Sequence, residues 1–395
     1  MKILYDYQAF DMQTHGGVSR YFSELISHLP QNIKTDISVI ETNNIYLKTL
    51  GKEPAGTLYK NFLWHKDSAI KHFIYKLYYN IKNGDFNRLD HTPAINRFES
   101  IKQLKEGDFD LLHPTFFDPY FLKFIGNKPF VITVHDMIPE LFPQYYARDD
   151  IQIRNNNIVI PQAAHIITVS KQTKLDLCRI MNIKEEQVSV VYHGANESQY
   201  IPNGNDKNYE YILYVGERCL YKNFINFAKC CAPILKRHKE LKVICTGKSF
   251  TDSEREMFKE WGIENRFKHI FVRNDQDMLD LYHYALAFIY PSSYEGFGLP
   301  ILEAYKADCP VLLNNASCFP EIAGDAAIFF NMNEKENNFE EQFETFYYLN
   351  GSERNELIKK QKERLKRYSW DKSAKKSAEI YQRWGCNLNC VKACS

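Results

Sequence analysis

Two glutamates flank a glycine-rich turn in the segment 290–304. The residues run Tyr-Pro-Ser-Ser-Tyr-Glu-Gly-Phe-Gly-Leu-Pro-Ile-Leu-Glu-Ala, so seven residues separate Glu295 from Glu303. An apolar run ends just before the turn, and Pro300 is typical of the first turn of a helix. The free N–H groups at such a helix start bind anions, above all phosphate. Carboxylates beside a phosphate site suit a ligand that joins a diphosphate to sugar hydroxyls.

Two cations lie on another expected turn, in the segment 214–224. Arg218 and Lys222 follow the apolar run 211–215, where a strand should lead into a helix. Two cations that meet a diphosphate neutralise its charge and the further charge that grows on a leaving group. Surface arginine and lysine side chains are more often simply solvated, so this role depends on the surrounding fold.

The N-terminal half contributes two further candidates. Gly16 and Gly17 follow the first apolar run and allow close backbone approach, while Ser19 or the helix start behind them could bind an oxyanion. His135 and Asp136 end another apolar run, at the carboxyl edge of an expected parallel strand, where open α/β sheets bind ligands. The competing interpretation of His135 is a hydrogen-bonded histidine at a strand end with no role in binding.

Short β-rich runs alternate with amphipathic or polar stretches along most of the chain. This order predicts parallel sheets covered by helices. Several runs lack apolar/polar alternation, as strands that are buried on both faces do. The expected strands are 2–7, 35–40, 110–113, 130–135, 165–169, 188–192, 211–215, 242–246, 269–272, 286–290, 310–313 and 327–330.

A chain of 395 residues is too long for one ordinary core, so two domains are expected. The stretch 198–208 is rich in Ser, Asn, Gly and Pro, which is a linker composition, and a new strand follows it. We therefore predict a first domain over 1–203 and a second over 204–367. A last helix is expected over 369–383, with Ser369 as its N-cap.

The eight residues around Glu295 resemble the hallmark of the largest family of retaining GT-B glycosyltransferases, glycosyl transferases group 1 (family 4). That hallmark is a Glu, seven residues, Glu motif in the context Glu-Gly-Phe-Gly-Leu-Pro, which this chain carries intact. Further similarity lies at 167–171, 190–195, 310–326 and 368–370. The resemblance implies two Rossmann-like domains that face each other across a cleft. It also implies that the helix within 368–395 crosses back to the first domain.

The same resemblance implies the roles of individual residues. The first glutamate would contact hydroxyls of the transferred sugar, and the second would contact the ribose of the nucleotide. The histidine would lie near the reacting carbon, the basic pair would hold the diphosphate, and the Gly-Gly loop would lie against donor phosphate or acceptor. The implied catalytic residues are His135, Arg218, Lys222 and Glu295, and the implied donor-binding residues are Gly16, Gly17, Phe297, Gly298, Leu299 and Glu303.

The resemblance further implies the reaction. A retaining, metal-independent hexosyltransferase would move a sugar from a UDP- or GDP-linked donor to a glycan or lipid-linked acceptor, in surface polysaccharide biosynthesis, without a cofactor. The chain departs from the family pattern at Glu217, which separates Gly216 from Arg218, at 272–275 and at Lys306. The departure at 272–275 is expected to reshape the pocket for the base.

Other function classes fit the chain less well. A dinucleotide fingerprint fails because Ile301 stands where a third glycine is needed, and a P-loop fails because Lys242 stands where its first glycine is needed. The net charge of +1 gives no global field for nucleic acid. The competing interpretation is a non-catalytic sugar-nucleotide-binding or scaffolding protein of the same fold. Without a signal peptide or an apolar span, the chain is expected in the cytoplasm.

One stretch, 59–82, combines lysines with aromatic residues and apolar residues at helical spacing. It predicts either a peripheral contact with the inner face of the membrane or an ordinary helix with solvated lysines. The C-terminal cysteines, Cys386, Cys390 and Cys394, lack a fourth zinc ligand and are expected to be reduced thiols.

Overall fold

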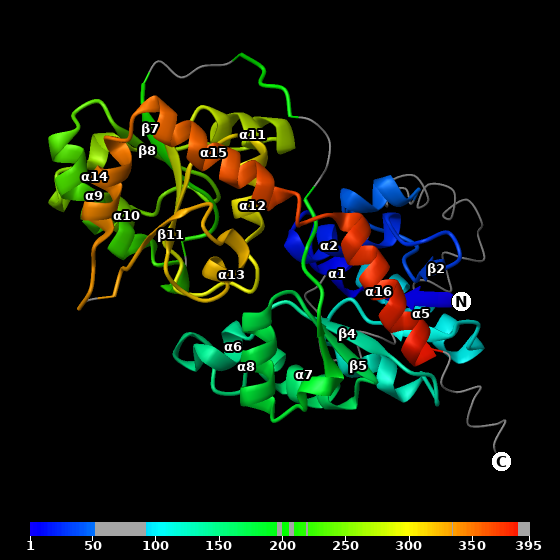
Figure 1. The fold of residues 1–395 in the computed structure, drawn as a ribbon. Helices are drawn as coiled ribbons and strands as arrows, with labels where there is room; N and C mark the ends of the chain where they lie inside the picture. The colour runs from blue at the N-terminus through cyan, green and yellow to red at the C-terminus, as the bar shows by residue number, and fades with distance from the viewer. Residues whose placement is uncertain (52–91, 196–199, 205–208, 219, 334, 386–395) are drawn as a thin grey trace, which may run out of the picture.

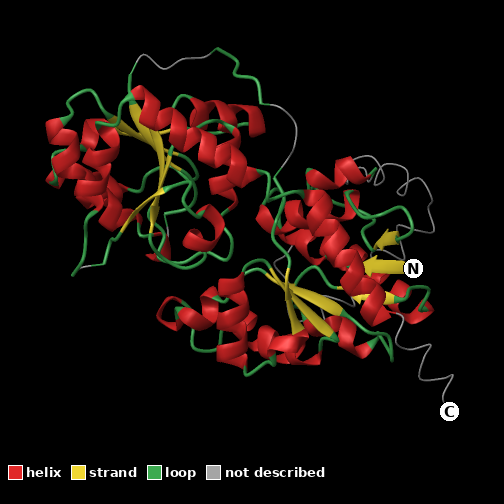
Figure 2. Cartoon of the chain, in the orientation of Figure 1, coloured by secondary structure: helices red, strands yellow, loops and turns green. Residues whose placement is uncertain are grey.

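The chain forms two α/β lobes (Figure 1). The computed structural model describes residues 1–395 except 52–91, 196–199, 205–208, 219, 334 and 386–395. The candidate membrane contact at 59–82 and the three C-terminal cysteines lie outside the described residues. Sheets run through the middle of both lobes with helices around them (Figure 2).

The strands fall into parallel sheets, as the expected alternation predicts. Their bounds are β1 Lys2–Tyr5, β2 Lys34–Ile37, β3 Leu111–His113, β4 Val131–Val134, β5 His165–Thr168, β6 Val188–Val190, β7 Tyr211–Tyr214, β8 Lys242–Cys245, β9 Phe267–His269, β10 Ala287–Tyr290, β11 Val311–Asn314 and β12 Ile328–Phe330.

Helices cover these sheets. The α-helices are α1 Gln8–Met12, α2 Gly17–Ser27, α5 Thr92–Glu106, α6 Ile138–Leu141, α7 Ile151–Val159, α8 Lys171–Met181, α9 Phe224–Arg237, α10 Asp252–Glu260, α11 Asp275–His283, α12 Leu299–Lys306, α13 Phe319–Ala323, α14 Phe339–Tyr347, α15 Gly351–Leu365 and α16 Trp370–Gly385. The 3₁₀ helices are η1 Tyr46–Leu50, η2 Pro119–Lys123, η3 Pro143–Tyr145, η4 Ile160–Gln162, η5 Glu185–Gln187, η6 Leu220–Lys222 and η7 Glu264–Arg266.

The order of strands explains where a ligand site can form. In the first domain the sheets run β2-β1-β3 and β4-β5-β6, and a parallel bridge between Leu112 and Phe130 joins them. In the second domain the single sheet runs β12-β11-β10-β7-β8-β9. The strand order of the second sheet reverses between β7 and β10, and ligands bind outside the carboxyl ends of strands at such a switch point. The loops that follow β7 and β10 are therefore the ones expected to build a site together.

Each expected strand has an observed counterpart, and the largest shift is at β9. The sequence predicted 269–272, whereas the paired residues are Phe267–His269. Ile270 and Val272 lie in the loop after β9, and their side chains pack against the core of the second domain, whereas Phe271 between them is exposed. The sequence pattern placed the strand here because these residues are apolar, but they are partly buried without pairing in the sheet.

The last helix, α16, returns to the first domain and lies beside α2, as predicted (Figure 1). Its Tyr381 hydroxyl lies 3.0 Å from the Tyr5 hydroxyl of β1 and 2.7 Å from Nδ1 of His113 in β3. The Nε2 atom of His113 lies 3.0 Å from the Thr133 hydroxyl of β4. Burial lowers the pKa of His113 to about 3, so this ring is a neutral hydrogen-bonding link between the helix and two strands.

None of the described helices combines the length and the apolar character that a membrane crossing needs.

The free energy of unfolding should fall as the pH drops from about 6.5 toward 3. The unfolded chain takes up a proton on His113 in this range, whereas the folded chain does not until pH is near 3. One such histidine contributes a slope of about 1.4 kcal/mol per pH unit. Urea unfolding of His113→Asn at several pH values should therefore give a slope that is smaller by about this amount. Equal slopes in the two proteins would show that His113 is protonated in the fold.

Candidate active site

An ion pair joins the two loops at the switch point of the second sheet. Lys222 ends η6 after β7, and its Nζ donates a hydrogen bond to Oε1 of Glu295, which follows β10, at 2.6 Å. The two side chains are 17% and 10% exposed, so the pair is shielded from most of the solvent. The Nζ also lies over the rings of Tyr221 and Tyr290, whose faces attract a cation. Two predicted site residues are therefore in direct contact.

The opposite wall is the carboxyl end of β4 in the first domain. A Cβ atom added at Gly296 would lie 1.8 Å from the carbonyl oxygen of His135, so only glycine permits this approach. The Thr173 hydroxyl of α8 donates to the carbonyl oxygen of Gly296 at 3.3 Å. The sequence analysis assigned Gly296 no role, although it stands inside the glutamate motif. The structure shows that it joins the motif to the first domain.

Asp136 follows His135, and charges of the second domain shift the pKa of its carboxyl group. Burial raises the pKa of its carboxyl group to about 6, and the hydrogen bond from the Ile138 N–H lowers it. The negative charge of Glu295 raises this pKa further, and the positive charge of Lys222 lowers it. Asp136 of the first domain therefore lies within electrostatic range of the Lys222–Glu295 pair of the second.

His135 belongs to an aromatic cluster between the domains. Its ring lies parallel to the ring of His193 at 5.8 Å and meets Tyr21 edge-on at 5.0 Å. Burial lowers the pKa of His135 to about 4, which keeps the ring neutral. Its Nε2 is buried, and no described residue forms a hydrogen bond with it. His193 in turn contacts the ring of Phe297, so the side chain of Phe297 belongs to the interface and its backbone is what remains for a ligand.

His193 is a residue whose importance the sequence analysis missed. Its pKa is lowered well below the ordinary value, first by burial and then by electrostatic interaction with His135 and Arg20. The signal was present, because His193 lies at a strand end directly before a glycine. A Cβ at Gly194 would lie 2.2 Å from the backbone nitrogen of Trp370, so this glycine lets the start of α16 approach the first domain.

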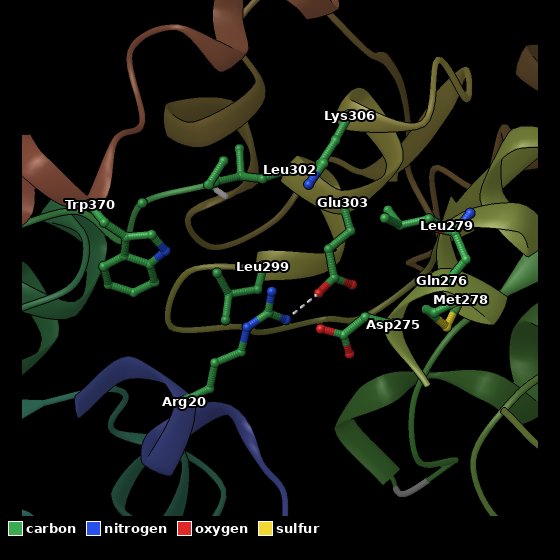
Figure 3. Close-up of a pocket in the computed structure, with 12 residues that line it drawn as sticks. Arg20, Asp275, Gln276, Met278, Leu279, Leu299, Leu302, Glu303, Lys306 and Trp370 are labelled. Carbon is green, nitrogen blue, oxygen red and sulfur yellow. Dashed lines mark hydrogen bonds and ion pairs between the residues drawn. The ribbon is translucent and has the colours of Figure 1, made fainter. Parts of the chain in front are cut away.

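Glu303 lies in a cavity of about 200 Å³ between the domains (Figure 3). Its Oε1 accepts a hydrogen bond from Nη1 of Arg20, on α2 of the first domain, at 2.9 Å. Its Oε2 accepts one from the Tyr282 hydroxyl at 3.4 Å. Gly298, whose φ of 91° is left-handed, precedes α12, and Leu299 at the start of α12 lines the cavity. The cavity is lined by Arg20, Gly194, Ala195, Asp275, Gln276, Met278, Leu279, Leu299, Leu302, Glu303, Lys306 and Trp370.

The Gly16–Gly17 loop opens α2 as expected, but its polar groups are partly occupied. The side-chain oxygen of Gln13 accepts a hydrogen bond from the Ser19 N–H at 3.1 Å, and the Ser19 hydroxyl donates to the carbonyl oxygen of Gly16. A Cβ at Gly16 would collide with the Gln13 amide, whereas one at Gly17 would meet nothing within 4 Å. Gly17 is therefore the open position of the loop, and the expected oxyanion contact of Ser19 would require its present hydrogen bonds to break.

Arg218 does not join Lys222 in the structure. Its Nε donates to Oε1 of Glu254 at 2.6 Å, and its Nη2 donates to the Ser249 carbonyl oxygen at 2.8 Å. The guanidinium lies over the Phe250 ring and its side chain is only 6% exposed. The contact of Arg218 with a diphosphate stays a prediction.

No three His, Cys, Asp or Glu side chains among the described residues lie close enough together to hold a metal ion.

Comparison with known families agrees with this arrangement. Residues 196–364 match the family Glycosyl transferases group 1, and residues 15–199 match Glycosyltransferase Family 4. The two matches together span both lobes and the cleft between them. The chain belongs to the group 1 glycosyltransferases.

Named relatives of this group 1 chain include bacterial mannosyltransferases. It is 27% identical over 220 residues to the O-antigen chain mannosyltransferase RfbU of Salmonella typhimurium, a match that covers 52% of this chain and 62% of the relative. It is 28% identical over 220 residues to O-antigen chain mannosyltransferase B of Escherichia coli, covering 52% of this chain and 58% of the relative. The matched stretch therefore spans about three fifths of the length of these curated relatives.

Solved structures show the fold of this group 1 chain. A glycosyltransferase from Rickettsia africae superposes with a TM-score of 0.64 at 18% identity, over 97% of this chain and 98% of the other. The Anabaena protein HepE in complex with UDP-glucose superposes with a TM-score of 0.68 at 16% identity, over 97% of this chain and 100% of the other. The fold is GT-B, as the sequence predicted.

Replacing Gly296 by Ala should push the glutamate motif of this group 1 chain away from β4, because the methyl carbon would overlap the His135 carbonyl oxygen. We expect the free energy of unfolding to fall by about 1–3 kcal/mol, as for other overpacked sites. We also expect the radius of gyration to rise as the lobes part. Urea unfolding and small-angle X-ray scattering measure the two effects. Gly351→Ala is the matched control, since a Cβ there meets nothing within 4 Å. Indistinguishable variants would contradict the proposed contact.

Proposed function

We propose that the chain is a retaining, metal-independent hexosyltransferase that moves a sugar from a nucleoside diphosphate donor to a glycan or lipid-linked acceptor. The observation that carries this proposal is the Lys222–Glu295 pair. Glu295 adjoins Gly296, which approaches the His135 carbonyl oxygen, and the motif continues into α12, where Glu303 lines the cavity. Membership of the group 1 glycosyltransferases supports the same reaction class. The proposed setting is surface polysaccharide synthesis on the cytoplasmic side of the membrane.

Each part of the site has a role in this proposal. Glu303 accepts hydrogen bonds from the ribose hydroxyls, and Glu295 accepts them from hydroxyls of the transferred sugar. The neutral ring of His135 has a buried Nε2 available for the sugar. Lys222 is the cation closest to Glu295, and it holds the diphosphate. The backbone of Phe297, Gly298 and Leu299 at the start of α12 lies beside the sugar or the phosphates.

The reaction exchanges one bond at the anomeric carbon for another. The bond from this carbon to the diphosphate oxygen breaks, and the acceptor oxygen bonds to the carbon on the same face. The acceptor proton passes to a diphosphate oxygen, so no covalent intermediate with the protein is required. Departure of the diphosphate builds up negative charge, and fixed cations in a site shielded from water stabilise such charge best. Lys222, mostly buried beneath two tyrosine rings, meets that requirement.

The names of relatives suggest which sugar to test first. Two of them are O-antigen chain mannosyltransferases, whereas HepE holds UDP-glucose. We therefore propose a mannosyl donor, GDP-mannose, with UDP-hexoses as the alternative within the same mechanism.

The test is the release of nucleoside diphosphate from a panel of GDP-, UDP- and dTDP-sugars, without and with EDTA. We expect release from one donor, insensitive to EDTA and reduced by about 100-fold or more in Glu295→Gln, because loss of one aligned charge contact costs this much in comparable sites. Glu340→Gln is the control, since Glu340 lies in an exposed ion pair with Arg237.

Anomeric configuration completes the test. Nuclear magnetic resonance of the product formed on a simple glycoside acceptor should show the configuration of the donor. An inverted product would overturn the retaining mechanism. A folded protein that neither binds nor hydrolyses any donor in the panel would favour the non-catalytic alternative.

A further inference from the structure

Arg20 extends from the first domain into the cavity that holds Glu303 (Figure 3). We propose that Arg20 is a donor-binding residue that exchanges partners: it pairs with Glu303 in the empty pocket and with the diphosphate once the ribose occupies Glu303. This inference rests on the proposed use of a nucleoside diphosphate sugar. The resemblance of the sequence to its family gave Arg20 no role.

Arg20 and the ribose hydroxyls would compete for the carboxylate of Glu303. A ribose diol donates two hydrogen bonds, and the two oxygens of a carboxylate offer about four lone-pair sites. Oε1 of Glu303 already accepts from Nη1 of Arg20 at 2.9 Å, while Oε2 is held more loosely by Tyr282 at 3.4 Å. A ribose that binds Glu303 with both hydroxyls therefore competes with the Arg20 guanidinium for Oε1.

Once Arg20 leaves Glu303, its guanidinium carries a positive charge that needs another partner. The side chains of Arg20 and Glu303 are 22% and 27% exposed, so a displaced guanidinium without an anionic partner is unfavourable. Asp275 lines the same cavity, and the diphosphate, which is joined to the same ribose, brings further negative charge for Arg20 to pair with. A guanidinium also matches two phosphate oxygens at once, which an ammonium group does not.

The other cations near the site also favour a role for Arg20 in binding the diphosphate. Lys306 lines the same cavity, and its pKa is lowered by burial and then by the positive charge of Arg20, while the carboxylates of Asp275 and Glu303 raise it. A ribose that takes up Glu303 leaves two cations facing Asp275, which favours an anionic group on the ligand. Arg218, the cation that the sequence assigned to the diphosphate, is engaged with Glu254 and Ser249 instead. Arg20, which lines the cavity of Glu303, is therefore the further cation that we assign to the diphosphate in addition to Lys222.

Calorimetry with matched ligands tests the exchange. The ligands are GDP and UDP, each with its nucleoside, guanosine or uridine, and the proteins are the full chain and Arg20→Gln. We expect Arg20→Gln to bind the preferred diphosphate about 10- to 100-fold more weakly, the effect of one charge-assisted contact. Its affinity for the nucleoside should be unchanged or higher, because the ribose no longer competes for Glu303. Arg20→Lys should recover part of the diphosphate affinity.

Arg97→Gln is the matched control. Arg97 pairs with Asp118 at 2.8 Å inside the first domain and is absent from the cavity lining. This variant should bind both ligands as the unmodified chain does. Circular dichroism and urea unfolding confirm that each variant is folded.

Other outcomes separate the possible errors. If Arg20→Gln bound the nucleoside and the diphosphate more weakly by the same factor, Arg20 would only shape the pocket. If it bound both more tightly, Arg20 would only compete with the ligand for Glu303. Unchanged affinities in Arg20→Gln would remove any role in donor binding. An unmodified chain that binds none of the four ligands would instead overturn the proposed function itself, before Arg20 is tested.

Discussion

The close approach of Gly296 to the carbonyl oxygen of His135 is the contact on which the site depends. It brings the glutamate motif of the second domain against the end of β4 in the first. A second contact supports it, because the Glu321 carboxylate of α13 accepts hydrogen bonds from the N–H groups of Lys171 and Gln172 at the start of α8. An acidic group at a helix N-terminus is favourable in charge as well as in hydrogen bonding. Together with the ring contact between His193 and Phe297, these contacts determine how the two lobes face each other.

Both glutamates of the motif are paired with a cation. Glu295 pairs with Lys222 of its own domain, whereas Glu303 pairs with Arg20 of the other domain. Mostly buried carboxylates require such partners, since an unpaired buried charge is costly. A ligand that carries both hydroxyls and phosphates can take over both sides of each pair, because hydroxyls donate to the glutamates and phosphates accept from the cations. The charges that stabilise the empty cleft are thus the ones that recognise the proposed donor.

The topology explains why these loops meet. β7 and β10 are neighbours at the reversal of strand order, so the loops carrying Lys222 and Glu295 emerge side by side although 72 residues lie between them in sequence. In the first domain, His135 follows β4, and α16 packs against β3 through the hydrogen bonds of Tyr381. The neutral histidines of this region, whose pKa values are lowered by burial, make the first domain sensitive to acid.

The sequence by itself determined the fold class, the strands with one notable shift, the crossing of the last helix and the position of the glutamate motif. The strands and the anion site at the motif follow from local chemistry: buried parallel strands are continuously apolar, and a strand, a glycine-rich turn and a helix form an anion site wherever they occur. The crossing of the last helix was implied by the resemblance to the family. Only the tertiary structure decided which charges pair. Arg218 and Lys222 were both predicted to hold the diphosphate, although Glu217 sets Arg218 apart from the family pattern. In the structure one meets Glu254 and the other Glu295. Arg20 carried no local signal at all, because its partner lies in the other domain and only the packing of the two lobes brings them together.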